Sequence, residues 1–219
     1  MRRLVGAYGL TCEVFAIPNC LIVGFDTPEG KPLTRMCRIP AHGTDIELLE
    51  RCNDLCRSLC QNPLPLDRAQ ELVDRLEPSC RQFPPQTLLL GYAAAAAFFA
   101  LFFGGSLRDC LSAGLCGLAV GLCLLFGQRF TGSNMFFRTL ICSFLAAGLA
   151  LLLVRLGLGE DQSCISIGTL MLLVPGMALT NAMREIMAGD LVSGLTRTAE
   201  VLLVATAIAL GTAIPLLYS

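Results

Sequence analysis

The stretch "TLLLGYAAAAAFFALFFGGSL" (residues 87–107) contains no charged side chain. A helix that crosses the hydrocarbon core of a bilayer needs about 20 consecutive apolar residues. The stretch also lacks the polar face, repeating every 3.6 residues, that a buried helix of a soluble bundle would show. It therefore predicts a membrane-spanning helix.

Four more apolar segments follow this one, and the third of the five is short enough that it must borrow flanking residues such as Phe136 and Phe137. We predict an α-helical integral membrane protein, in which a small α/β cytoplasmic domain precedes a five-helix transmembrane bundle. The expected spans are residues 87–107, 110–128, 136–155, 162–181 and 198–218.

The charged residues are unevenly distributed along the chain. Residues 1–81 contain ten Lys or Arg and eleven Asp or Glu, whereas residues 82–219 contain six of each. Overall only 15% of residues are charged, compared with roughly 25% in an ordinary soluble domain. We predict two domains, a cytoplasmic α/β head (1–82) and a transmembrane domain (83–219).

The head shows mixed strand and helix patterns. Short β-rich runs at 12–18, 20–26 and 32–39 predict a hairpin or a three-stranded meander. Helix patterns follow at 43–61, with Thr44 or Asp45 as the N-cap, and at 63–78.

The orientation follows from the positive charges in short loops, because cytoplasmic loops carry an excess of Lys and Arg. If the head is cytoplasmic, four arginines lie inside and two outside; these are Arg129, Arg138, Arg184 and Arg197 inside, and Arg108 and Arg155 outside. We expect a multi-pass protein of the plasma or inner membrane, with the C-terminus outside.

The fourth apolar segment contains Pro175 and Gly176. Proline removes a backbone hydrogen bond within a helix, and the freed groups need partners in lipid. Discontinuous helices of this kind often form the substrate site of secondary transporters. A simple packing kink is the alternative.

A cluster of polar and charged residues follows the break. Its first group is spaced i, i+3, i+4 and its second i, i+3, i+7, i+10, so each group shares one helical face. We predict that these residues bind the substrate, with Arg197 and Glu200 able to pair at i, i+3. The alternative is a solvated loop with interfacial anchoring. The site comprises Asn181, Arg184, Glu185, Asp190, Ser193, Arg197 and Glu200.

These side chains suit a small zwitterionic or anionic solute. A guanidinium binds a carboxylate, and an acidic side chain binds an ammonium group or a transported proton. A small amino acid or carboxylate fits both.

Several other function classes are disfavoured by the sequence. There is no G-x-x-x-x-G-K-[ST] motif for an ATPase, and His42 is the only histidine, which excludes an H-E-x-x-H metalloprotease. Ser193 and Gly194 lack the full G-x-S-x-G pattern. The net charge of −1 and the absence of a basic patch argue against nucleic acid. We expect no enzyme activity, no cofactor and no metal.

Two further patterns involve small residues and thiols. Gly117 and Gly121 form a G-x-x-x-G pair that lets helix backbones approach closely, unless the glycines are incidental. Cys52, Cys56 and Cys60 are spaced i, i+4, i+8 and are expected to form an apolar or dimer-facing stripe, since three thiols without a fourth ligand make a weak zinc site.

The sequence "LVPGMALTNAMREIMAGDLVSGLTRTAEVLLVATAIALG" (173–211) resembles the signature region of the threonine/serine exporter family, and "AYGLTCEVFAIPNCLIVGFDTPEGKPLTRMCRIP" (7–40) resembles that family's strand region. Glu185 stands where an Asp is common. The family usually has another helix before "RRLVGAYGL", so the resemblance implies a mis-assigned start or a truncated head.

The resemblance implies a subunit that exports threonine, serine or a small dicarboxylate such as succinate. It is similar to the split form of the family, which works with a second small transmembrane subunit in an oligomer. A non-transporting scaffold or sensor subunit is the alternative function. The solute, the driving ion and the role of the head are left open by the sequence.

Overall fold

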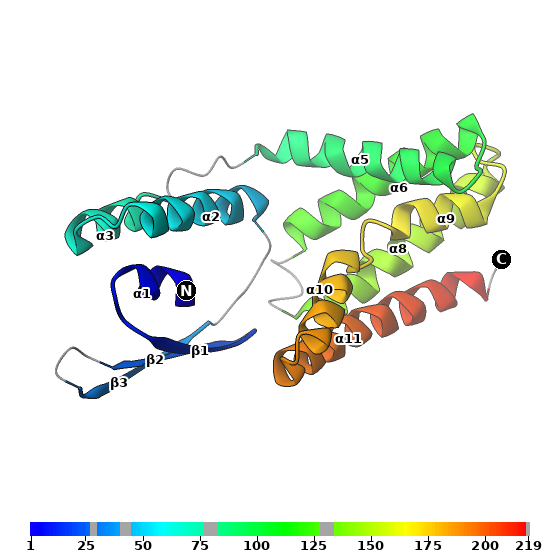
Figure 1. Cartoon of the computed structure of the whole chain (residues 1–219). Helices are drawn as coiled ribbons and strands as arrows, with labels where there is room; N and C mark the ends of the chain where they lie inside the picture. The colour runs from blue at the N-terminus through cyan, green and yellow to red at the C-terminus, as the bar shows by residue number, and fades with distance from the viewer. Residues whose placement is uncertain (27–29, 40–44, 77–82, 128–133, 218–219) are drawn as a thin grey trace. The chain divides into compact units, whose positions relative to one another are not determined.

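The computed structural model describes residues 1–26, 30–39, 45–76, 83–127 and 134–217. Contacts divide the chain into two units (Figure 1). The head unit comprises Met1–Gln82 with Asp190–Thr196, and the membrane unit comprises Phe83–Gly189 with Arg197–Ser219. The boundary of the two predicted domains falls next to residues 77–82, outside the described part, and stays a prediction.

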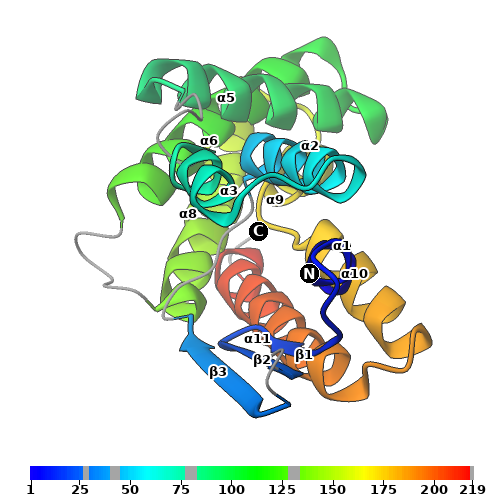
Figure 2. The same cartoon turned by 60° about the vertical axis from the view of Figure 1, so that its left-hand side comes forward.

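The head unit contains a three-stranded antiparallel sheet in the order β1-β2-β3, which Figure 2 shows as a meander. The strands are β1 Cys12–Ile17, β2 Cys20–Asp26 and β3 Pro32–Arg38. Val14 pairs with Val23, and Val23 pairs with Arg35. Of the two predicted arrangements, the structure adopts the meander.

Three helices accompany the sheet: α1 Arg2–Ala7, α2 Ile46–Gln61 and α3 Leu66–Asp74. The Asp45 side chain caps α2 by accepting a hydrogen bond from the Leu48 amide at 3.0 Å. The alternative cap, Thr44, lies outside the described residues. The Tyr8 hydroxyl donates to the Leu64 carbonyl at 2.8 Å and so ties α1 to the loop before α3.

The membrane unit contributes helices long and apolar enough to span a bilayer, and four such helices occur in the described residues. The predicted membrane protein is confirmed, but all four of these spans begin earlier than expected and three end earlier, whereas the third ends at Arg155 as predicted. The first ends at Phe102 because Gly104 turns the chain with a φ of +91°, a conformation that glycine adopts readily. The four helices are α5 Pro85–Phe102, α6 Leu107–Phe126, α8 Met135–Arg155 and α11 Leu191–Leu216.

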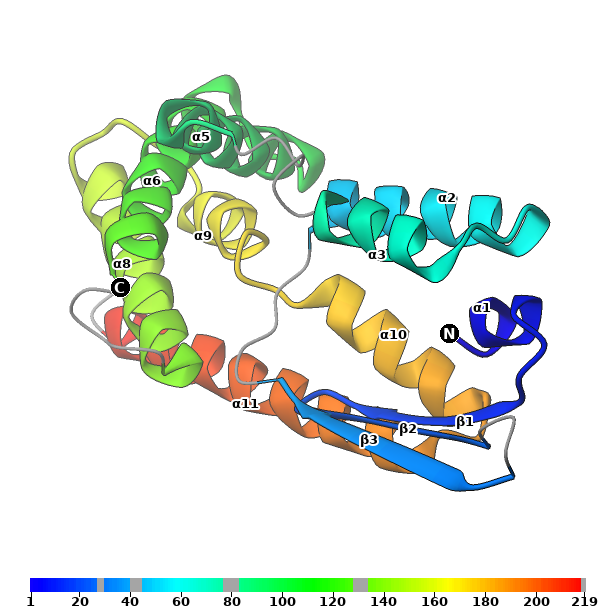
Figure 3. The same ribbon diagram turned by 90° about the vertical axis from the view of Figure 1, so that its left-hand side faces the viewer.

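The span expected at 162–181 is not one helix, and the break predicted at Pro175 and Gly176 is present. The structure has two short helices instead, α9 Gln162–Leu170 and α10 Gly176–Met187, with a change of direction between them (Figure 3). At 1.5 Å per residue, α9 is about 14 Å long, roughly half of the hydrocarbon thickness. Hydropathy indicated an apolar segment correctly but did not indicate that the helix was interrupted.

Small residues bring the helices of the membrane unit close together. A Cβ on Gly117 of α6 would lie 2.7 Å from both the Ala96 Cβ and the Tyr92 carbonyl of α5. A Cβ on Gly121 would lie 2.7 Å from the Tyr92 ring. The two glycines of the G-x-x-x-G pair therefore lie in the α5–α6 contact and are not incidental.

Helix α9 lies inside this bundle and contacts α5, α6 and α8. Its Ile165 is fully buried together with residues of three neighbouring helices, Ala100, Cys116 and Ala150. The bundle thus buries a short helix that ends before it could cross a membrane.

Candidate functional site

The break between α9 and α10 is centred on Pro175. Just before it, the Leu173 amide donates to the Leu170 carbonyl at 2.8 Å, one residue short of the α-helical spacing. Pro175 then takes the N-cap position of α10, with φ −82° and ψ 57°. Its ring has no N–H and would clash with the carbonyl four residues earlier in a continuous helix. The chain therefore leaves the helical path between Met171 and Pro175.

The first predicted polar group lies on α10. Asn181 and Glu185 are half-buried, whereas Arg184 is exposed. The spacing i, i+4 places Asn181 and Glu185 on one face. Arg184 therefore does not share the environment of the other two.

An ion pair connects α10 to the last helix. The Arg197 Nε lies 3.1 Å from Glu185 Oε1, and the two side chains are 38% and 21% exposed. The Nε atom is itself buried, and its N–H makes no well-aligned hydrogen bond with any described residue, so the contact is electrostatic. Spacing along one helix identified Glu200 as a possible partner of Arg197 but could not identify Glu185.

The second predicted polar group lies at the start of α11, which begins seven residues earlier than the predicted span. Ser193, Arg197 and Glu200 all belong to this helix, and the exposed Asp190 directly precedes it. Ser193 is buried and Glu200 is half-buried. Asp190 and Ser193 are grouped with the head unit, whereas Arg197 and Glu200 belong to the membrane unit together with Glu185.

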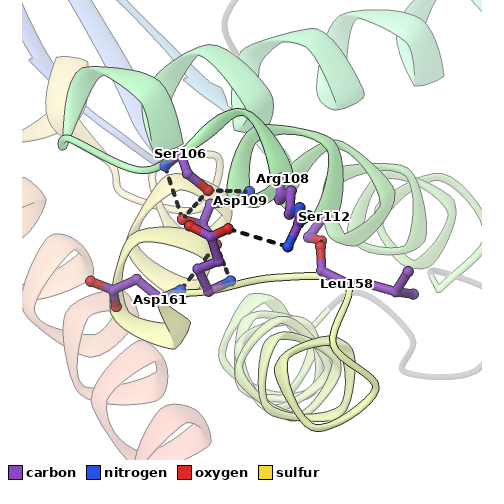
Figure 4. Close-up of polar contacts among 7 residues, drawn as sticks. Ser106, Arg108, Asp109, Ser112, Leu158 and Asp161 are labelled. Carbon is purple, nitrogen blue, oxygen red and sulfur yellow. Dashed lines mark hydrogen bonds and ion pairs between the residues drawn. The ribbon is translucent and has the colours of Figure 1, made fainter.

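A third charged feature was not predicted. Asp109, near the start of α6, is 1% exposed, and both of its carboxylate oxygens accept hydrogen bonds (Figure 4). Oδ2 accepts from the Ser106 amide and hydroxyl, each at 2.9 Å. Oδ1 accepts from the amides of Glu160 at 2.7 Å and Asp161 at 3.0 Å. An ionised carboxylate accepts at both oxygens, so four donors converging on Asp109 favour its charged form.

The two bonds from Glu160 and Asp161 fix the start of α6 to the segment that precedes α9, while the two from Ser106 cap α6 itself. The Ser112 hydroxyl adds a hydrogen bond to the Leu158 carbonyl at 2.9 Å, and Arg108 pairs with Glu160 at 3.4 Å (Figure 4). Asp161 in turn caps α9 by accepting from the amides of Ser163 and Cys164. We call this cluster the Asp109 anchor, comprising Ser106, Asp109, Ser112, Leu158, Glu160 and Asp161.

The sequence did contain a signal for the anchor. Ser106 and Asp109 form the S-x-x-D pattern of a capping box ahead of an apolar run, and both capping bonds are present. The contacts to residues 158–161 join positions about fifty apart in the chain, which no local pattern encodes.

No metal-ligating cluster of three or more His, Cys, Asp or Glu occurs within the described ranges. Burial raises the pKa of the Cys60 thiol, and the neighbouring Cys56 raises it further. The three cysteines of the predicted stripe are free thiols; these are Cys52, Cys56 and Cys60.

Comparison with known proteins matches the chain to one family. A family model for threonine/serine exporters covers residues 1–217. A curated relative from Mycobacterium tuberculosis, described as "Probable threonine/serine exporter", is 25% identical over 214 residues. The match covers 96% of this chain but only 40% of that relative. No solved structure matches the chain significantly.

Proposed function

The chain belongs to the threonine/serine exporter family, and from that premise we propose that it is a subunit of a secondary exporter for small metabolites. The proposed solutes are threonine- or serine-type amino acids, or a small dicarboxylate. The chain spans 40% of the length of the curated relative, and we propose that it works with a second small membrane subunit.

The observation that carries the proposal is the ion pair between Arg197 and Glu185. It joins the helix that follows the Pro175 break to a helix long and apolar enough to span the membrane. Ionisable groups in or near a bilayer are costly and usually pair with each other or mark a pathway. A helix interruption within the same segment is the arrangement that many transporters use around their substrates.

In the proposed site, the positive and the negative side chains bind different groups of the solute. Arg197 is positioned for the carboxylate of the solute, because a guanidinium offers several donors in a rigid plane. Glu185 and Glu200 suit an amino group or a co-transported cation. Binding of a zwitterion would then replace the Arg197–Glu185 pair with two new pairs to the solute.

We also propose how the chain crosses the membrane. Helices α9 and α10 together contain 21 residues, from 9 and 12, and would span about 30 Å if they crossed in sequence. That pair would provide the fourth of five crossings. It would place the head in the cytoplasm and the C-terminus outside, as the arginine distribution predicts.

The proposal is tested by efflux of labelled threonine, serine and succinate from preloaded cells. The chain is co-expressed with its neighbouring membrane subunit, and wild type is compared with Arg197→Gln and Glu200→Gln at equal membrane levels. Efflux with wild type that falls at least tenfold in both variants supports the exporter and its site. No efflux of any of the three solutes overturns the exporter assignment and favours the scaffold or sensor subunit.

A further inference from the structure

Helix α9 carries a polar face inside the bundle. Gln162 and Ser166 are spaced i, i+4, so their side chains lie on one face, with Cβ atoms about 5–6 Å apart. Ser166 is only 8% exposed. The side of α9 one residue further round the helix is open, since Ser163 and Ile167 are exposed. One face of this short helix, which contacts α5, α6 and α8, therefore buries polar atoms.

The buried polar atoms on this face have no partner. Neither the Ser166 Oγ nor the Gln162 Nε2 makes a hydrogen bond to any part of the chain that the structure describes, although both atoms are buried. Thr169, on the same helix, shows the contrast, because its hydroxyl donates to the Ile165 carbonyl at 2.8 Å. A serine hydroxyl in a helix can make that same backbone bond, but Ser166 does not.

Leaving a buried donor unsatisfied costs about 1–3 kcal/mol. Two such groups one turn apart destabilise the bundle, so packing gives no reason for them. Both atoms are uncharged donors, and an uncharged donor pair suits an oxygen of a polar molecule. The cost is offset when an oxygen of such a molecule accepts hydrogen bonds from both groups.

We propose that Ser166 and Gln162 form a second contact point for the exported solute, where both side chains donate hydrogen bonds to one of its carboxylate or hydroxyl oxygens. This rests on the proposed function and extends it to α9, on the other side of the Pro175 break from Glu185 and Arg197. The solute class that fits is a small molecule with an oxygen acceptor separate from the group bound by Arg197. Hydroxy amino acids and dicarboxylates both meet this condition.

The test uses Ser166→Ala in the full chain, co-expressed with the neighbouring membrane subunit. The exposed Ser163→Ala on the same helix is the matched control, and Gln162→Met is a second variant that keeps side-chain length without the amide. Three quantities are measured for each: the half-saturating concentration of threonine, serine and succinate for efflux, the thermal midpoint without solute, and the rise of that midpoint with each solute.

We expect Ser166→Ala and Gln162→Met each to raise the half-saturating concentration about 3–10-fold, because each variant loses one hydrogen bond to the solute. The solute-induced rise of the midpoint should shrink in parallel. The midpoint without solute should be unchanged or higher, because the deleted groups have no protein partner. Ser163→Ala should match wild type in all three measurements.

Two results overturn the inference while leaving the exporter intact. In the first, Ser166→Ala and Gln162→Met export all three solutes like wild type. In the second, they lower the midpoint without solute, which would show that these side chains support the fold. If wild type exports none of the three solutes, the exporter assignment and this inference both fall.

Discussion

Arg197 on α11 lies 3.1 Å from Glu185 on α10, so one ion pair links the two helices on either side of the turn at Ala188–Asp190. Both side chains remain partly open to solvent, which weakens the attraction between them. The pair is therefore a poor source of stability and a good candidate for exchange with a charged solute.

This relationship predicts that Glu185→Gln changes export more than stability. We expect the free energy of unfolding to change by less than about 1 kcal/mol, as for other partly exposed pairs. We expect efflux to fall at least tenfold. Thermal melts and efflux at equal membrane levels check both quantities. The exposed Arg184→Gln on the same helix is the control, and an equal loss of efflux there would contradict a specific role for Glu185.

The Asp109 anchor predicts a large loss of stability in Asp109→Asn. In the asparagine amide an NH₂ group replaces one of the two carboxylate oxygens. The two donors that bonded to that oxygen then face another donor and lose their acceptor. Hydrogen bonds to a charged group contribute about 1.5–3 kcal/mol each, and we expect a loss of about 3 kcal/mol. Denaturation of the purified protein measures it.

The matched control for the anchor is Ser112→Ala, which deletes one uncharged hydrogen bond to Leu158. It should cost about 1 kcal/mol. If Asp109→Asn costs no more than Ser112→Ala, the carboxylate neither caps α6 through Ser106 nor holds α6 to the start of α9 through Glu160 and Asp161.

The α5–α6 contact predicts opposite outcomes at two glycines one turn apart. A Cβ at Gly117 would lie 2.7 Å from Ala96 and Tyr92, whereas a Cβ at Gly114 would lie 3.6 Å from its neighbours, an ordinary contact. Gly117→Ala should therefore destabilise the protein by about 1–3 kcal/mol. Gly114→Ala should be neutral or slightly stabilising, since alanine favours a helix. Thermal unfolding of the two variants tests this prediction. Similar unfolding midpoints for Gly117→Ala and Gly114→Ala would contradict the close packing at Gly117.

The raised pKa of Cys60 predicts slow alkylation. A higher pKa leaves a smaller fraction of thiolate at a given pH, and the thiolate is the reactive form. Between pH 7 and 9, iodoacetamide should label Cys60 more slowly than the exposed Cys52. The labelling rate of Cys60 should keep rising with pH beyond the ordinary range of a cysteine thiol, because its pKa is raised. Mass spectrometry of the labelled peptides reports each rate, and Cys56→Ala should speed up the labelling of Cys60.

The sequence predicts the head well because its signals are local. The strands at 12–18, 20–26 and 32–39 and the Asp45 cap depend on neighbouring residues, and the structure reproduces them. The apolar spans are likewise recognisable from composition. Family membership, suggested by the motif around 173–211, is confirmed by the family match.

The sequence was less informative where the answer depends on contacts between distant residues. For the segment 162–181, Pro175 and Gly176 predicted the break, but hydropathy gave the wrong extent of the span, because it measures transfer into lipid and not the continuity of a backbone. The ion pair of Arg197 with Glu185 required α10 and α11 to be placed next to each other. The unpartnered state of Ser166 could be seen only once its neighbours were in place.

The Asp109 anchor also determines where the membrane unit can bend. Two of its hydrogen bonds, from the amides of Glu160 and Asp161 to the Asp109 carboxylate, hold the segment that leads into α9, so the start of this helix is fixed. The α-helical hydrogen bonds are interrupted between Met171 and Pro175, at the end of α9 that lies away from the Asp109 anchor. A rocking motion of α10 against α9 would therefore bend the chain at Pro175 and leave the hydrogen bonds of Asp109 in place.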